Sequence, residues 1–434
     1  MDICRWKRLK VLVVAASYPY PGSMVSGSFN EKSVLALAEH CNTVEVLVPR
    51  PYAPPILSSL SPRWRGYARI VGQEVRSGVP VYRPAYLQIP RVGGAFWTDP
   101  GAFFWCRRTA IEMHRRVGFD GIISFDLVGA GGMAWRLGHE LGIAATGWGT
   151  GGDMRVPAAS SHGRVLIRSL RNLDVIFYQS HELLEKAASL LGLTPDYLPP
   201  DRHVVLYRGI KAPPPLPRTE VRRRIRGEWG VNDDQVVVLS IGRITRQKGL
   251  FELMEAIALT VARGCKVICV MIGAQPSLDE TAIVQRKLDE TPTLKEHARI
   301  MPACSPDRVW EYLCAADIFA FPSHREGMPN ALLEAMAMGV PSIAFGIPPV
   351  LEIEAGTGGV VVVPPLDAAS FAEAIWRLAA FPDDRTRIGE RGSIRVADRF
   401  MVQKNVAEAV RRLAQVVAAK RTSASKSTAR LSHQ

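Results

Sequence analysis

The chain has 434 residues, of which 47% are hydrophobic and 22% charged, and its net charge is +13. This length and composition predict a globular protein of two or three domains, and no run of eighteen apolar residues suggests a transmembrane helix. The basic surface suits anionic lipid or glycan better than nucleic acid, because no nucleic-acid-binding motif accompanies the charge. The seven cysteines form no Cys-x-x-Cys pairs, so we expect reduced thiols and a cytoplasmic protein.

The first half of the chain alternates short apolar runs with amphipathic segments, which predicts a parallel sheet covered by helices. The apolar run at 11–15 is short for a signal peptide and continues into a turn, so we interpret it as the first strand. A Gly- and Ser-rich loop follows, containing Gly27 and Phe29, and leads into a helix from about Glu31. Further strands are expected at 44–48, 121–124 and 173–179.

Two segments of this half could meet an apolar or anionic surface. Residues 84–106 are rich in aromatic residues and broken by Gly and Pro, so they either bind an apolar ligand, rest against a membrane or simply cover the core. Arg164, Arg168 and Arg171 fall at helical spacing beside apolar residues. Such a pattern is typical of a helix on an anionic bilayer and equally of a solvated helix face.

A glycine-rich segment permits another interpretation of this half. Gly129, Gly131 and Ala134 fit the pattern G-x-G-x-x-A, and Asp153 follows 24 residues after Gly129, near the spacing of a ribose-binding acid. The pattern therefore raises the hypothesis of a nicotinamide-dependent oxidoreductase. However, the fingerprint belongs in the first β-α-β unit, and a glycine-rich helix packed on the sheet explains the residues as well.

A proline-rich run at 212–217 is a stiff connector and marks a domain boundary. The second domain begins with an apolar strand at 235–241, which ends at Gly242 and Arg243 and is followed by Lys248 and a helix. A glycine there lets a ligand approach the backbone, and two cations beside a helix start favour an anion. An ordinary basic surface loop is the alternative.

The most informative stretch follows a buried strand expected at 318–321. A loop carrying Glu326 leads into a short helix carrying Glu334, with Asn330 as the expected N-cap. The order strand, loop, helix places the loop where α/β proteins bind ligands and aims free amides at them. The two carboxylates could hold the hydroxyl pairs of a ribose and a hexose at opposite ends of a ligand roughly 8 to 10 Å long. Two solvated glutamates are the alternative.

This stretch, S-x-x-E-G-x-P-N-x-x-L-E-A-M-A-x-G-x-P at 323–341, resembles the signature of retaining GT-B glycosyltransferases of the family 4, or group 1, type. The run G-R-x-x-x-x-K-G at 242–249 resembles the same family's diphosphate-binding motif. The resemblance spans most of the chain and is most specific from 242 to 334.

The resemblance implies a donor site for a nucleotide diphosphate sugar. Arg243 and Lys248 would stabilise the departing diphosphate, Glu326 would hold the sugar, whether or not it acts as a nucleophile, and Glu334 would hold the ribose. It also implies binding roles for neighbouring residues and for the first strand-to-helix loop, namely Gly242, Gly327, Met328, Pro329, Asn330, Ala331, Leu332, Gly27 and Phe29.

The sequence departs from the family in one segment. Residues 144–153 resemble a segment that usually reads His-Gly-x-Asp, which makes Thr150, Gly151 and Asp153 candidate binding residues. Thr150 stands where the family often has His, and Thr cannot supply the ring nitrogens of that residue. An upstream His that is common in relatives is likewise missing, with Phe125 and Asp126 in its place.

We therefore expect an α/β protein with the GT-B fold, two Rossmann-like parallel-sheet domains facing a cleft. The expected parts are an acceptor-side domain at 1–211, a linker at 212–230, a nucleotide-sugar-binding domain at 231–398, a helix returning to the first domain at 399–420 and a disordered tail at 421–434.

The expected activity is retaining hexosyl transfer from a nucleotide diphosphate sugar, with UDP among the nucleotides, to a glycan or lipid-linked acceptor in cell-envelope or exopolysaccharide assembly. We expect no cofactor and no metal, because the chain contains no Asp-x-Asp. An anionic surface on the inner face of the plasma membrane is an expected partner. A catalytically inactive partner-binding or membrane-binding module and the oxidoreductase remain the alternatives.

Overall fold

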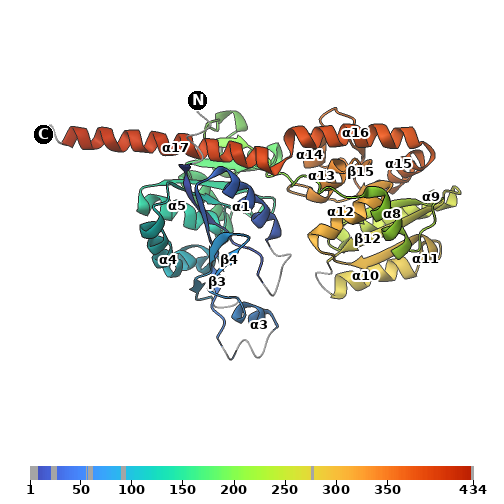
Figure 1. Cartoon of the computed structure of the whole chain (residues 1–434), viewed down its shortest axis with the longest axis horizontal. Helices are drawn as coiled ribbons and strands as arrows, with labels where there is room; N and C mark the ends of the chain where they lie inside the picture. The colour runs from blue at the N-terminus through green and yellow to red at the C-terminus, as the bar shows by residue number, and fades with distance from the viewer. Residues whose placement is uncertain are drawn as a thin grey trace. The chain divides into compact units, whose positions relative to one another are not determined.

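A computed structural model of the chain describes residues 8–20, 27–54, 56, 62–88, 94–274 and 278–431. The chain forms two compact units (Figure 1): unit 1 comprises Met1–Arg208 and Val402–Gln434, and unit 2 comprises Gly209–Met401. Within the described ranges, no helix has both the length and the apolar character needed to cross a membrane. The six cysteines in these ranges are all free thiols.

Unit 1 is built on an eight-stranded sheet in the order β10-β9-β8-β7-β1-β2-β5-β4. All neighbours pair in parallel except the edge strand β4, which is antiparallel to β5. The strands are β1 (Lys10–Val14), β2 (Thr43–Leu47), β4 (Gln73–Arg76), β5 (Val79–Tyr82), β7 (Gly121–Ser124), β8 (Ala144–Gly149), β9 (Val175–Tyr178) and β10 (His203–Val205); β3 (Arg50–Pro51) and β6 (Ala85–Tyr86) form a separate pair.

Helices cover both faces of this sheet, as its doubly buried strands require. They are α1 (Ser28–His40), α3 (Pro62–Ala68), α4 (Ala102–Val117), α5 (Ala130–Leu141), α6 (Ser161–Asn172), α7 (His181–Leu191) and α17 (Val402–Leu431). Val11 and Val13 share a core with α1 and α17, which run side by side in Figure 1. Leu12 and Val14 point to the other face and share a core with α4, α5, α6 and α7.

Unit 2 is built on a six-stranded parallel sheet in the order β13-β12-β11-β14-β15-β16. Its strands are β11 (Val236–Ile241), β12 (Val267–Gly273), β13 (Ala298–Pro302), β14 (Ile318–Phe321), β15 (Ser342–Phe345) and β16 (Val361–Val363). The strand order reverses between β11 and β14. In open α/β sheets, ligands bind outside the carboxyl ends of the strands at such a reversal.

The helices of unit 2 are α8 (Arg218–Glu228), α9 (Leu250–Ala262), α10 (Leu278–Asp289), α11 (Leu294–His297), α12 (Pro306–Ala315), α13 (Asn330–Ala337), α14 (Pro348–Glu354), α15 (Ala368–Ala380) and α16 (Pro382–Arg399). Val238, Ile318 and Phe345 of the sheet share a core with α9 and α15, which pack against each other. Helix α8 packs on α12, and α13 packs on α16.

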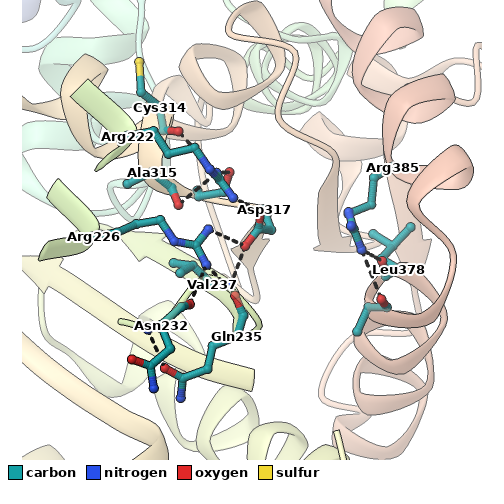
Figure 2. A network of polar contacts seen from close by, with 12 residues as sticks. Arg222, Arg226, Asn232, Gln235, Val237, Cys314, Ala315, Asp317, Leu378 and Arg385 are labelled. Carbon is teal, nitrogen blue, oxygen red and sulfur yellow. Dashed lines mark hydrogen bonds and ion pairs between the residues drawn. The ribbon is translucent and has the colours of Figure 1, made fainter. Parts of the chain in front are cut away.

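Asp317 fixes the two strands at the reversal beside each other (Figure 2). Its carboxylate accepts a hydrogen bond from the Val237 amide of β11 at 2.7 Å, immediately before β14 begins. The same carboxylate forms ion pairs with Arg222 at 2.5 Å and with the buried Arg226 at 3.1 Å. Helix α8 is thereby tied to the strands whose far ends carry the predicted donor motifs.

Helix α17 differs from the sequence prediction. It continues as helix to Leu431, into the segment 421–434 that composition predicted to be disordered. The first part of α17 is packed on unit 1, so the helix is already nucleated and each further residue adds a hydrogen bond at little cost. The hydroxyls of Thr422 and Ser423 also bond back to the carbonyls of Ala418 and Ala419, at 3.0 and 3.1 Å.

Helix α6 corrects one interpretation of its arginines. Val165, Leu166 and Leu170 are buried in the core of unit 1, so the apolar side of this helix faces the protein and not a bilayer. Arg164 and Arg168 remain exposed on the opposite side. Of the aromatic segment 84–106, residues 89–93 lie outside the described ranges.

Candidate functional site

The loops after β11 and β14 lie against each other at the carboxyl edge of unit 2. Gly249 ends the first loop with a φ of 69°, and a Cβ there would come within 1.8 Å of the Pro322 carbonyl at the end of β14. Gly273, at the end of β12, approaches Gly242 so closely that a Cβ would lie 1.4 Å from the Gly242 carbonyl. Glycine is therefore required at both positions for the loops to meet.

The structure pairs the two candidate residues that sequence reasoning assigned to different parts of the donor. The Lys248 Nζ forms an ion pair with the Glu326 Oε1, and the stem of Lys248 lies over Gly242. The Ser323 hydroxyl donates to the same Glu326 oxygen at 2.7 Å. Because both side chains are mostly buried, with exposed fractions of 20% for Lys248 and 16% for Glu326, the pair is held in a defined place at the sheet reversal.

Two further donor-site candidates, Arg243 and Glu334, differ in their exposure to solvent. Arg243 is exposed at the start of the first loop and forms no ion pair with another described residue. Glu334 is half-buried on α13, and its charge acts on the Cys304 thiol. Arg243 and Lys248 line the same small pocket at the end of β11, so two cations lie close together at this edge of the sheet.

The start of α13 corrects the predicted cap. Asn330 is the first helical residue and Pro329 the N-cap, with no side-chain hydrogen bond to the first turn. Proline has a fixed φ and no amide hydrogen, so it begins the helix one residue earlier than expected. Gly327 and Met328 are half-buried in the loop, and Ala331 is half-buried in the first turn. Leu332 is fully buried, so only its backbone can face a ligand.

In unit 1, the candidate residues gather around a buried arginine that sequence reasoning did not select. Arg208 donates to the Phe29 carbonyl at 3.1 Å, to Asn30 Oδ1 at 2.8 Å and to Ser33 Oγ at 2.9 Å. Its guanidinium lies 4.5 Å from the Phe125 ring and 5.1 Å from the Phe29 ring. The sequence feature that could have indicated Arg208 is its position directly after Leu206 and Tyr207, the apolar residues that follow β10.

Gly27 supports the same arrangement from the N-terminus of α1. It has a φ of 72°, and a Cβ there would meet the Ser17 carbonyl carbon at 2.6 Å. The loop after β1 therefore folds closely onto the start of α1, where Arg208 binds. Glycine at this position is explained by the backbone alone.

Thr150 and Asp153 form one hydrogen-bonded turn at the end of β8, around the buried Gly151. The backbone amide and hydroxyl of Thr150 donate to Asp153 Oδ1 at 2.7 and 2.8 Å, and the Leu127 amide donates to Asp153 Oδ2 at 2.6 Å. Burial, and then the charge of Asp126, raise the pKa of Asp153 to about 7. Burial lowers the pKa of Arg208 to about 9, opposed by the charges of Asp126 and Asp153.

The glycine-rich start of α5 has a packing explanation. A Cβ at Gly131 would meet the Asp126 carbonyl at 3.0 Å, and one at Gly132 would lie 1.6 Å from the Asp99 carboxylate. The Asp126 side chain accepts from the amides of Gly129 and Ala130 at 2.7 and 2.8 Å. The helix start is therefore occupied by a carboxylate of the chain itself, and β7 is not part of the first β-α-β unit.

Comparison with known proteins points to one family. Residues 221–395 match the family model described as glycosyl transferases group 1. TuaC of Bacillus subtilis strain 168, whose name assigns it to the glycosyltransferases of teichuronic acid biosynthesis, is 28% identical over 372 residues, which are 85% of this chain and 89% of TuaC.

Two solved structures share the fold over nearly the whole chain. Sucrose-phosphate synthase of Thermosynechococcus elongatus has a TM-score of 0.72 at 19% identity and covers 94% of this chain and 100% of its own. HepE of Anabaena, solved in complex with UDP and glucose, has a TM-score of 0.67 at 16% identity and covers 96% of this chain and 100% of its own.

Proposed function

We propose that the chain is a group 1 glycosyltransferase that transfers a hexose from a UDP-sugar, with retention of configuration, to a glycan or lipid-linked acceptor. The match of residues 221–395 to that family, the similarity to TuaC and the GT-B fold support this assignment. The observation that carries the proposal is the pairing of Lys248 with Glu326 at the strand reversal of unit 2. A cation and a carboxylate at that edge suit the phosphate and sugar ends of one donor.

The proposed chemistry is electrostatic. Lys248 and Arg243 stabilise the negative charge that develops on the departing diphosphate, and this stabilisation is greatest in the transition state. Glu326 accepts hydrogen bonds from sugar hydroxyls, and its position is fixed by the Ser323 hydroxyl. Glu334 binds the ribose, and the amides at the start of α13 bind the phosphates. Since the two cations provide the stabilisation, we expect transfer to continue in excess EDTA.

The similarity to HepE, which was solved with UDP and glucose, supports UDP as the nucleotide. The similarity to TuaC supports an acceptor from envelope polysaccharide assembly. We propose that unit 1 binds this acceptor, with the residues around Arg208 at the carboxyl edge of its sheet as the contact region. In this proposal Thr150 does not contact the ligand, as the His of relatives would, but holds the Asp153 carboxylate in place through two hydrogen bonds.

We further propose that the protein works at the inner face of the plasma membrane. Phe104 and Trp105 in the first turn of α4 are 75% and 50% exposed, and their rings contact edge to face at 6.1 Å between centroids. Arg108, one turn further, is 91% exposed at its side chain. Exposed aromatic residues beside a cation suit an anionic bilayer surface. Binding to phosphatidylglycerol vesicles and none to phosphatidylcholine vesicles is expected; equal binding or no binding contradicts this part.

The test of the proposed activity is donor turnover. The protein is incubated with UDP-glucose and a set of polysaccharide repeat acceptors, UDP release is measured, and the anomeric proton of the product is assigned by NMR. We expect release of UDP and a product whose new glycosidic bond is axial, as the bond between sugar and phosphate is in the donor. Release of no UDP from any UDP-hexose, together with intact binding to membranes or partners, would establish the inactive module instead.

A further inference from the structure

Unit 1 carries an open groove of about 640 Å3 between α4 and the ends of the edge strand β4 and its neighbour β5. Three arginines line it, namely Arg50, Arg83 and Arg116, together with Tyr82 and Thr109. We call it the arginine groove. Its volume is in the range of sites that hold small molecules, and none of the binding residues indicated by the sequence motifs lines it.

Each charged side chain that lines the arginine groove, except Arg50, has a partner of opposite charge, and these partners lie outside the lining. The pairs are Arg116 with Glu45 at 2.7 Å, Arg83 with Glu74 at 2.6 Å and Arg108 with Glu112 at 2.9 Å. Two of these carboxylates, Glu45 and Glu74, are largely covered, with side-chain exposures of 8% and 19%. The pairs therefore form a wall in which positive and negative charges balance, and the Arg108 to Glu112 pair is its most exposed part.

Arg50 is the cation left over by this pairing. Its Nε donates to the Arg83 carbonyl at 3.1 Å, which fixes the direction of the guanidinium. Within the described ranges, no carboxylate lies at ion-pair distance from Arg50. Its side chain is half-buried, and partial burial together with the neighbouring charge of Arg83 lowers its pKa. A half-buried cation without a counterion is stabilised when an anion binds.

We propose that the arginine groove binds an acidic saccharide, with a sugar carboxylate paired to the terminal nitrogens of Arg50. The uncompensated charge of the groove is one, which a carboxylate balances, whereas a phosphate monoester would bring nearly two negative charges. A planar guanidinium fixed at Nε also matches the geometry of a carboxylate. This inference rests on the proposed function in one respect only: it takes the saccharide bound in the groove to be part of the acceptor, which is then an acidic glycan.

Binding of a defined probe tests the proposal independently of transfer. Tetragalacturonate and its methyl ester, which has the same sugars without the charge, are titrated into the full-length protein by calorimetry. Wild type is compared with Arg50→Gln, with Thr109→Glu, which adds a carboxylate to the wall without touching Arg50, and with Arg107→Gln. Arg107 lies on α4, as Thr109 does, but it does not line the groove. Arg107→Gln removes one positive charge, as Arg50→Gln does.

The proposal expects saturable binding of tetragalacturonate by wild type and by Arg107→Gln, at least tenfold weaker binding by Arg50→Gln and Thr109→Glu, and no binding of the ester. Equal binding of the ester, equal weakening by Arg107→Gln, or stronger binding of glucose 6-phosphate than of galacturonate would overturn it. UDP is titrated into the same samples, so a failure of the donor site in unit 2 is seen separately.

Discussion

Lys248 and Glu326 lie on the loops after β11 and β14 and form an ion pair with each other through Nζ and Oε1. In the mechanism proposed above, a diphosphate that binds Lys248 competes with Glu326 for the same cation, and donor binding frees the carboxylate to contact the sugar. We expect Glu326→Gln to bind UDP as tightly as wild type or a few-fold more tightly, because Lys248 loses its internal partner.

The same Glu326→Gln variant should lose transfer by about 100-fold or more, as expected when a charged contact to the reacting sugar is removed. Calorimetry with UDP and initial rates of transfer measure the two effects. Glu255→Gln, an exposed carboxylate on α9, is the matched control and should change neither. A loss of UDP affinity in Glu326→Gln as large as that in Lys248→Ala would contradict the competition.

Gly249→Ala should destabilise unit 2 through backbone geometry. The added Cβ would meet the Pro322 carbonyl at 1.8 Å in a left-handed conformation, and we expect a loss of about 3 kcal/mol or more in the free energy of unfolding. Gly264→Ala is the control, because Gly264 is also left-handed but has open space around it. It should lose only about 1 to 2 kcal/mol. Equal losses in urea unfolding would refute the close approach of the two loops.

Asp317→Ala should be costly because it leaves Arg226 without its carboxylate. Arg226 is 4% exposed, and removal of one partner of a buried ion pair costs about 3 to 5 kcal/mol. Arg224→Ala on the same helix breaks two solvent-accessible pairs, with Glu228 and with Glu311, and should cost less than about 1 kcal/mol. Urea unfolding distinguishes the two variants, and similar stabilities would show that Asp317 does not tie α8 to β14.

The sequence predicted the fold well, but it did not predict the contacts between the residues of the two donor motifs, whose roles stay a proposal. Strands such as VVVLSI and IFAF are recognisable because they are buried on both faces and bounded by glycine or proline. The pairing of Lys248 with Glu326 was not predictable, because the two residues are 78 positions apart and meet only through the strand reversal. Arg208 was missed for a similar reason, since its partners come from α1.

The stability of unit 1 should depend on pH through Asp153. Its pKa is raised from 3.8 to about 7 in the folded state, so the folded chain holds this proton more tightly than the unfolded chain. The resulting stabilisation is fully present below pH 3.8 and is lost as the pH rises toward 7. Asp153→Asn does not titrate, so the difference in Tm between wild type and this variant should shrink from pH 5 to pH 8.

The control for this pH dependence is Asp196→Asn, which removes an exposed carboxylate of the same unit. Its difference in Tm from wild type should stay constant over the same range. If the Tm of wild type rises relative to that of Asp153→Asn as the pH increases, the folded protein favours the ionised carboxylate, and burial does not raise the pKa of Asp153.

Thermal melting with nucleotides tests the account most directly. At about a hundred times its dissociation constant, a ligand stabilises the folded protein by about 2.7 kcal/mol. We predict that UDP raises the Tm of wild type and of Arg263→Ala, an exposed control in unit 2, and leaves that of Lys248→Ala unchanged. A shift with NAD and none with UDP, or an equal UDP shift in Lys248→Ala, would contradict a donor site built around Lys248 and Glu326.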